Sequence, residues 1–237
     1  MIPPRYFALI PAAGVGARMG ASMPKQYARV AGKPMLRHVL DTFAETEAIT
    51  HTFAVVSGND AYIEEVMHDG PALAGRVTIV RDGGASRRES VLNGLLAMRP
   101  QVADDEWVLV HDAARPCIDR ELVEQFLDEV GDDPIGGLLA MPLADTLKSA
   151  DENLRVAATI PRINLWRAQT PQMFRYELLR RGLDRRPDAT DEAQAVESVG
   201  YNAPRLVQGE NLNIKVTFSE DLQLAEMILA RQGRAAA

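Results

Sequence analysis

Residues 6–27 read YFALIPAAGVGARMGASMPKQY. An apolar run typical of a buried strand leads directly into glycines and other small residues. Arg18 and Lys25 follow, and no carboxylate occurs between residues 11 and 27, although the formal net charge of the chain is -7. A glycine-rich, purely cationic loop at the end of a strand therefore needs an explanation.

The composition of this loop suits a bound polyanion such as a nucleoside triphosphate. Backbone N–H groups approach phosphates closely only where side chains are small, as at Gly14, Gly16 and the neighbouring alanines. Arg18 and Lys25 supply the positive charge that the phosphates require. The alternative is a flexible surface turn that carries two solvated cations.

Two well-known glycine loops do not match this stretch. A Walker A loop requires glycine-lysine followed by serine or threonine, whereas the nearest triplet, Gly32-Lys33-Pro34, ends in proline. The dinucleotide fingerprint G-x-G-x-x-G fails because the third glycine, Gly20, comes one place late. A nicotinamide enzyme is therefore disfavoured.

Beyond the loop, apolar runs typical of strands alternate with helical patterns. The expected strands cover 6–11, 51–57, 76–80, 106–112 and 135–143, and the expected helices cover 35–45, 61–69, 86–100 and 119–131. This alternation predicts a largely parallel sheet with helices on both faces. Since such sheets bind ligands at the carboxyl ends of their strands, the glycine loop and HDAARP (111–116) should face one site.

Local signals fix several helix ends. Ser86, with Glu89 three residues later, predicts a helix start, and Asp119 predicts another. Toward the C-terminus, three helices are expected at 175–183, 190–200 and 219–232, the last one capped, and two short strands at 204–209 and 213–218.

Residues 142–165 break the alternation. The stretch is polar, with β-like pieces TLKSA and VAATI around the turn signal DEN. It is either a solvated surface hairpin or an arm that packs on a second subunit. One domain spanning 1–237, with this excursion, is the simplest partition.

Composition excludes several classes of protein. Cys117 is the single cysteine, so no internal disulfide is possible, and we expect a reducing, cytoplasmic setting. The four histidines form no cluster with zinc spacing. The acidic balance argues against a general nucleic-acid surface, and the apolar run near the N-terminus is too short for a membrane span.

Seven blocks, taken in order, resemble one family. They are AAGVGARMGASMPKQY (12–27), DGGASRRESVLNGL (82–95), VHDAARP (110–116), LWRAQTPQ (165–172), TDEA (190–193), NIKVT (213–217) and EDL (220–222). Together they are similar to the 2-C-methyl-D-erythritol 4-phosphate cytidylyltransferases of the non-mevalonate isoprenoid route. The resemblance implies a Rossmann-like nucleotidyltransferase fold with a β-arm that joins two subunits into a homodimer. It also implies transfer of CMP from CTP to methylerythritol phosphate with Mg2+, releasing pyrophosphate.

The resemblance assigns roles to individual residues. The implied catalytic cations are Arg18, Lys25 and Lys215, and the implied metal ligand is Asp112. The implied nucleotide-binding residues are Pro11, Ala12, Ala13, Gly14, Gly16, Arg18, Lys25, Gly84, Ser90, Asp112 and Ala113. The implied binding residues for the polyol phosphate are Arg115, Thr146, Arg162, Thr190 and Lys215, of which Thr146 and Arg162 would reach the partner's site from the arm.

Some residues receive a structural interpretation instead. His111 is expected to be a hydrogen-bonded structural residue, and Trp166 a core residue. Arg87 and Arg88 are expected on solvated faces, although this pair lies close to the nucleotide blocks. The same is expected of Arg180, Arg181, Arg185 and Arg186. The chain departs from the family pattern at Leu212 and at Phe218-Ser219. We take both as variation in packing.

Other functions stay open at this point. A ribitol-5-phosphate cytidylyltransferase would share the loop and a block similar to HDAARP. A non-catalytic nucleotide-binding module would lack Lys25, Asp112 or Lys215, and all three are present. A metal-dependent glycosyltransferase should show an Asp-x-Asp pair, whereas His111-Asp112-Ala113-Ala114 contains one carboxylate.

Overall fold

The computed structural model describes residues 4–14, 23–68, 73–200 and 203–234. A seven-stranded sheet forms its centre, in the order β11-β7-β10-β6-β1-β4-β5. Its strands are β1 (Tyr6–Pro11), β4 (Ile49–Val55), β5 (Val77–Val80), β6 (Trp107–Val110), β7 (Gly136–Pro142), β10 (Trp166–Arg175) and β11 (Arg205–Gln208). β10 runs antiparallel to both of its neighbours, and every other pair is parallel. The predicted, mostly parallel sheet is confirmed.

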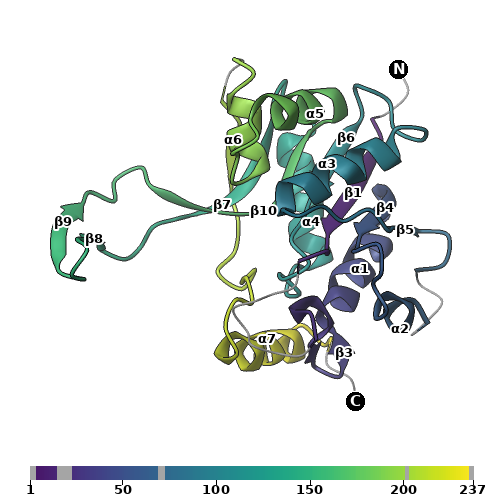
Figure 1. Cartoon of the computed structure of the whole chain (residues 1–237), viewed down its shortest axis with the longest axis horizontal. Coiled ribbons are helices and arrows are strands. Elements are labelled where there is room, and N and C mark those ends of the chain that lie inside the picture. Colours follow the sequence, from purple (N-terminus) through teal and green to yellow (C-terminus); the bar gives the residue numbers. More distant parts are fainter. Residues whose placement is uncertain (1–3, 15–22, 69–72, 201–202, 235–237) are drawn as a thin grey trace.

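Helices cover both faces of this sheet (Figure 1). The helices on the two faces are α1 (Met35–Glu45), α2 (Ile63–His68), α3 (Arg87–Met98), α4 (Arg120–Val130), α5 (Tyr176–Arg185) and α6 (Glu192–Glu197). The chain also contains α7 (Glu220–Arg231) and a short 3-10 helix η2 (Lys25–Tyr27). Side chains alternate along β1, so Ala8 and Ile10 pack with α1, α2 and α4. Phe7 and Leu9 pack with α3, α5 and α6 on the other face.

A smaller core lies below the sheet edge. It joins α7 to the two-stranded ribbon of β2 (Arg29–Val30) and β3 (Lys33–Pro34). Cys117 is buried in this core, and burial raises the pKa of its thiol to about 12. In the part of the chain that the structure describes, no helix is long and apolar enough to cross a membrane.

Two of the three predicted helix caps are confirmed. The Ser86 side chain accepts a hydrogen bond from Glu89 N (3.1 Å), and Asp119 accepts one from Leu122 N (3.0 Å). The predicted capping of the last helix is wrong for Ser219, whose side chain makes no cap hydrogen bond. Asp221 serves that turn instead, because its carboxylate accepts from Thr217 N and Phe218 N.

Two elements differ from the prediction. Residues 213–218 do not form a strand, because this segment follows the loop after β6, where Val216 N donates to Ala114 O (2.8 Å). β10, the longest strand of the sheet, is absent from the expected strands. Polar residues and Pro171 interrupt its apolar pattern, and its first three residues are exposed.

Residues 142–165 form a protruding arm, visible at the left of Figure 1. Its tip is the antiparallel pair β8 (Leu147–Ala150) and β9 (Val156–Ile160), as the two β-like pieces predicted. The arm carries apolar side chains into solvent, with Leu154 89% exposed and Ile163 81% exposed. Trp166, where the arm meets the sheet, is 39% exposed, so its prediction as a core residue is wrong.

The start of β7 depends on a glycine. Gly136 has φ +116°, and a Cβ there would overlap Met173 O and lie 2.8 Å from Phe174 Cδ1. We expect Gly136→Ala to lower the free energy of unfolding by about 2–4 kcal/mol, from backbone strain and overpacking together. Chemical denaturation measures this change.

Gly58→Ala is the matched control, because a Cβ there meets only Arg81 O at an ordinary 3.7 Å. An equal stability change in both variants would contradict the packing described for β7 and β10.

Candidate active site

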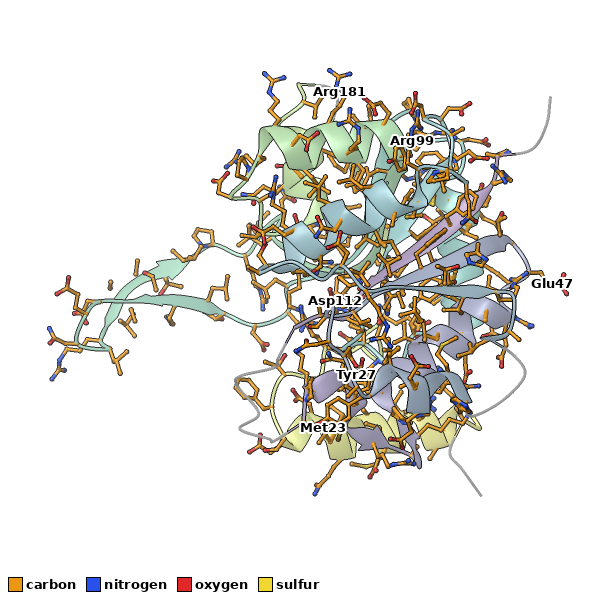
Figure 2. The ribbon with its side chains drawn as sticks, turned by 45° about the vertical axis from the view of Figure 1, so that its right-hand side comes forward. Met23, Tyr27, Glu47, Arg99, Asp112 and Arg181 are labelled. Atoms are coloured by element: carbon orange, nitrogen blue, oxygen red, sulfur yellow. The ribbon has the colours of Figure 1, made fainter. Side chains whose placement is uncertain are left out.

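A cleft of about 660 Å3 opens at the carboxyl edge of the sheet. The segments that follow β1, β4 and β6 meet there with η2, the start of α3 and the segment after residue 213. Its lining residues are Pro11, Ala12, Ala13, Gly14, Lys25, Gln26, Ser57, Gly84, Ala85, Ser86, Arg87, Ser90, Asp112, Ala113, Ala114, Lys215 and Thr217. Figure 2 shows Asp112 near the middle of the body, above Tyr27.

The structure brings together most of the predicted nucleotide residues. Pro11, Ala12, Ala13, Gly14, Lys25, Gly84, Ser90, Asp112 and Ala113 all line this cleft. Gly16 and Arg18 lie outside the described residues. The predicted convergence of the glycine loop and HDAARP at one sheet edge is therefore observed for the described part of the loop.

Two glycines beside the cleft allow the loop before α3 to pack closely against its neighbours. A Cβ at Gly83 would overlap the Ala13 side chain, and one at Gly84 would overlap Glu89. Gly84 N donates to Ser90 Oγ (3.1 Å), and Ser90 Oγ donates to Ser86 O (3.0 Å). The loop before α3 is thus held against the first turn of the helix.

Asp112 is the electrostatic centre of the cleft. It is 7% exposed, and its Oδ2 lies 2.7 Å from Lys215 Nζ and 3.8 Å from Arg115 Nε. Its Oδ1 accepts a hydrogen bond from Arg87 Nε (2.8 Å). Burial alone would raise the pKa of this carboxyl, but the charges of Arg87, Lys215 and Arg115 outweigh it and hold the pKa well below its usual range. Asp112 is therefore ionised across the physiological range.

The prediction of a solvated face is wrong for Arg87. Its guanidinium bridges Asp112 and Glu192, donating to Glu192 through Nη1 (2.6 Å) and Nη2 (3.0 Å). Burial opposes its charge, but the two carboxylates prevail and raise the pKa of Arg87 above its ordinary value. A signal was available in the sequence, because the first turn of a helix after a glycine loop faces the ligand edge of such a sheet.

The same prediction is wrong for Arg88 in a different way. Its Nε and Nη2 donate to Leu183 O, which ties α3 to the end of α5. Arg180, by contrast, forms exposed ion pairs with Glu177 and Asp184, as expected of a solvated face.

A chain of hydrogen bonds fixes the loop that carries Asp112. Asp112 N donates to Thr170 Oγ1 (3.1 Å), and Thr170 Oγ1 in turn lies 3.1 Å from His111 Nδ1. His111 Nε2 lies 3.2 Å from Arg115 O. Because a carbonyl can only accept, Nε2 carries a proton. Burial lowers the pKa of His111 to about 4, so the imidazole is neutral at neutral pH and Nδ1 accepts from the Thr170 hydroxyl. His111 is a structural residue, as expected.

The predicted residues for the polyol phosphate are only partly gathered. Lys215 lines the cleft, and Arg115 is buried beside it, donating to Asn213 O (2.6 Å). Thr190 lies just before α6, where it donates to Gln194 Oε1 and takes no part in the cleft lining. Thr146 and Arg162 are exposed on the arm, outside this chain's own cleft.

Lys25 and Lys215 both line the cleft. Lys25 Nζ donates to Val216 O (3.2 Å), the residue after Lys215. Lys25 thereby connects η2, which follows the glycine loop, to the segment that carries the second lysine. Two of the three predicted catalytic cations therefore share the cleft with Asp112.

Asp112 is the residue to consider for a divalent cation. Among the described residues, no group of three or more His, Cys, Asp or Glu side chains could hold a metal ion. Mg2+ commonly takes one or two carboxylates and completes its coordination with phosphates and water. A lone carboxylate in the wall of the cleft fits that chemistry, with Lys215 beside the same oxygen, Asp112 Oδ2.

Fold and site together define a nucleotidyltransferase-like α/β protein, with a glycine loop after β1 and a basic cleft at the sheet edge. The family model for 2-C-methyl-D-erythritol 4-phosphate cytidylyltransferase matches residues 6–231. The chain belongs to this family.

Relatives of known name belong to the same family. A 2-C-methyl-D-erythritol 4-phosphate cytidylyltransferase from Azoarcus sp. (strain BH72) is 50% identical over 226 residues, covering 95% of this chain and 94% of the relative. One from Dechloromonas aromatica (strain RCB) is 49% identical, with 95% and 98% coverage.

Solved structures agree as well. A crystal structure of 4-diphosphocytidyl-2C-methyl-D-erythritol synthase matches with a TM-score of 0.84 and 38% identity, covering 97% of this chain and 100% of the other. The 2-C-methyl-D-erythritol 4-phosphate cytidylyltransferase of Thermus thermophilus matches with a TM-score of 0.75 and 31% identity, with the same two coverages.

The buried imidazole makes stability depend on pH. Burial lowers the pKa of His111 to about 4, and in the unfolded chain a histidine titrates near ~6.5. The folded state therefore binds fewer protons below pH ~6.5, and acid favours unfolding. We expect His111 to cost about 1.4 kcal/mol of stability per pH unit between those two values.

Urea denaturation from pH 7.5 to 5 measures this slope. His111→Gln keeps one donor and one acceptor and should flatten the slope, while His68→Gln, on the exposed side of α2, controls for the substitution itself. An unchanged slope in His111→Gln would show that this imidazole is not the group responsible.

Proposed function

We propose that this chain transfers the cytidylyl group of CTP to 2-C-methyl-D-erythritol 4-phosphate, giving 4-diphosphocytidyl-2-C-methyl-D-erythritol and pyrophosphate for isoprenoid precursor synthesis. The observation that carries the proposal is the convergence of Lys25, Lys215 and Asp112 on one cleft, in a chain whose family is named for this reaction.

The chemistry needs no general base. The second pKa of a phosphate monoester is near ~6, so the attacking phosphate is largely dianionic at neutral pH. Its oxygen attacks the α-phosphorus of CTP in line with the departing pyrophosphate. The main barrier is the repulsion between two anions, which fixed positive charge and alignment reduce.

The cations of the cleft would carry out this task. Lys25 would stabilise charge on the α-phosphate and the leaving pyrophosphate, together with Arg18. Lys215 would contact both phosphates, because it projects into the cleft beside Asp112. These roles account for cations at the site of an acidic chain.

The wall of small residues would hold the nucleotide. Backbone groups of Pro11, Ala12, Ala13, Gly14 and Gly16 would cradle the triphosphate, and Ala113 would line its path. Gly84 and Ser90, which hydrogen-bond to each other, would face the cytosine and ribose.

Asp112 is the proposed ligand of Mg2+. Asp112 would hold the ion, which would supply positive charge to offset that of the phosphates. The chain's own contribution is to keep Asp112 ionised and its loop fixed through Thr170 and His111.

The acceptor would be bound by residues of two chains. Arg115, Thr190 and Lys215 would come from the chain that binds CTP, and Thr146 and Arg162 from its partner's arm. Exposed apolar side chains along the arm support a homodimer, because apolar patches of this kind mark protein contacts. The single cysteine, Cys117, suits the reducing cytoplasm that we propose as its location.

A pyrophosphate-release assay with CTP and Mg2+ tests the activity. The reaction with methylerythritol phosphate should release pyrophosphate from CTP, and the reaction with ribitol 5-phosphate should release far less. Lys215→Ala should reduce kcat about 10²- to 10³-fold, because it removes a charge fixed at the reacting phosphates.

Lys33→Ala is the matched lysine control, since Lys33 pairs with Asp41 away from the cleft and should leave kcat unchanged. Faster turnover of ribitol 5-phosphate would overturn the proposed acceptor. Wild-type turnover in Lys215→Ala would overturn the proposed role of that lysine.

Sharing of the site between chains predicts complementation. Lys25→Ala and Arg162→Ala homodimers should each be nearly inactive. A purified heterodimer contains one intact site, so its activity should be about half that of wild type.

Differently tagged chains, separated after co-expression, allow this measurement. The two homodimers, carried through the same purification, are the controls. A verified heterodimer without activity would show that each chain builds its own site.

A further inference from the structure

Arg87 joins two carboxylates that lie on different elements. It is the first residue of α3 and lines the cleft. Its Nε donates to Asp112 Oδ1 (2.8 Å), and its two terminal nitrogens donate to the two oxygens of Glu192 (2.6 and 3.0 Å). All three nitrogens of the guanidinium are therefore engaged at once.

Glu192 is not itself a cleft residue. Its side chain is 1% exposed, and it is absent from the cleft lining. The hydrogen bonds of its carboxylate within the described residues all come from Arg87. Among the described residues, Arg87 therefore links the buried carboxylate of Glu192 to Asp112 in the cleft.

The start of α6 gives Glu192 a fixed position. Gln172 on β10 accepts from Ala193 N (2.8 Å) and donates to Asp191 Oδ2 (3.1 Å). Asp191 also caps the helix, accepting from Gln194 N (2.9 Å). Since Gln172 pairs with Val110 at the end of β6, Glu192 is anchored close to Asp112, which follows that strand.

We propose that Arg87 is a positioning residue for the cytidylyl transfer, which uses Glu192 as an anchor to fix the orientation of the Asp112 carboxylate. The proposal rests on the proposed function. Arg87 occupies Oδ1 and leaves Oδ2 for Lys215 and for the phosphate side of the cleft. Asp112 thereby presents one defined oxygen to the reacting groups.

The geometry requires arginine rather than any cation. A guanidinium is planar and donates in a fixed fork, which suits two parallel bonds to one carboxylate. An ammonium has its three donors on one nitrogen, so it cannot place separate nitrogens against both oxygens of Glu192 and against Asp112 Oδ1. A residue that only balanced charge would not need this fork.

The test is the kinetics of Glu192→Gln, a change outside the cleft. We expect kcat to fall about 10- to 100-fold, as when partners that orient a site ligand are removed, while the KM values for both substrates change less than about threefold. Arg87→Lys should lower kcat as much as Arg87→Met does, although lysine keeps the positive charge.

A double variant keeps the test usable if Arg87→Met folds poorly. Arg87→Met/Glu192→Gln removes the unpaired anchor charge, and its kcat should equal that of Arg87→Met alone, because both changes break one unit. Arg88→Met is the matched control, since Arg88 bonds to Leu183 O and should alter thermal stability without altering kcat.

The outcomes separate cleanly. A kcat within about twofold of wild type in Glu192→Gln, or rescue by Arg87→Lys, would overturn the positioning role. A loss confined to the KM of the acceptor would also overturn it, since the pair would then serve Thr190 and not Asp112. If the wild-type protein itself releases no pyrophosphate, the proposed function fails, whatever the variants do.

Discussion

The structure depends on one buried, ionised aspartate that several cations surround. Asp112 contacts Arg87, Lys215 and Arg115, and Arg87 also holds Glu192, so three cations face two carboxylates. Asp112 and Glu192 are buried, so removing the arginine that joins them leaves uncompensated charge, which costs several kcal/mol. The same arrangement leaves one net positive charge beside the cleft. The cluster therefore stabilises the fold and prepares the cleft for anions.

The sheet explains how residues so far apart in sequence meet. Parallel β1 and β6 end at the same edge, which brings the glycine loop beside Asp112. β10 enters between β6 and β7 in the opposite direction and places Thr170 against the loop of His111 and Asp112. Gln172 on the same strand anchors α6. An antiparallel strand inside a parallel sheet thus supplies the supports of the site.

Features set by local interactions could be predicted from the sequence. The caps at Ser86 and Asp119 depend on residues three positions away, and both are observed. The loop residues from Pro11 to Gly14 reach the cleft because a strand and a small-residue turn define their place. The arm's two short strands followed from their β-like composition and the turn between them.

Features set by distant partners could not be predicted in the same way. Arg87 is one of several arginines, and only the fold shows that Glu192, 105 positions later, meets it. Trp166 is apolar, and hydrophobicity alone does not distinguish a core position from an exposed one at the base of an arm. Residues 213–218 have the composition of a strand. In the fold, Val216 hydrogen-bonds to Ala114 and to the Lys25 side chain, and the segment does not join a sheet.

We propose that fixed cations bring two mutually repelling phosphates together beside Asp112. A crystal structure with CTP, Mg2+ and a non-reacting analogue of the acceptor phosphate tests this most directly. We predict that Lys25 and Lys215 lie within hydrogen-bond distance of the α-phosphate, with the acceptor phosphate on the Lys215 side. A triphosphate bound elsewhere on the protein, with both lysines directed into solvent, would contradict the account.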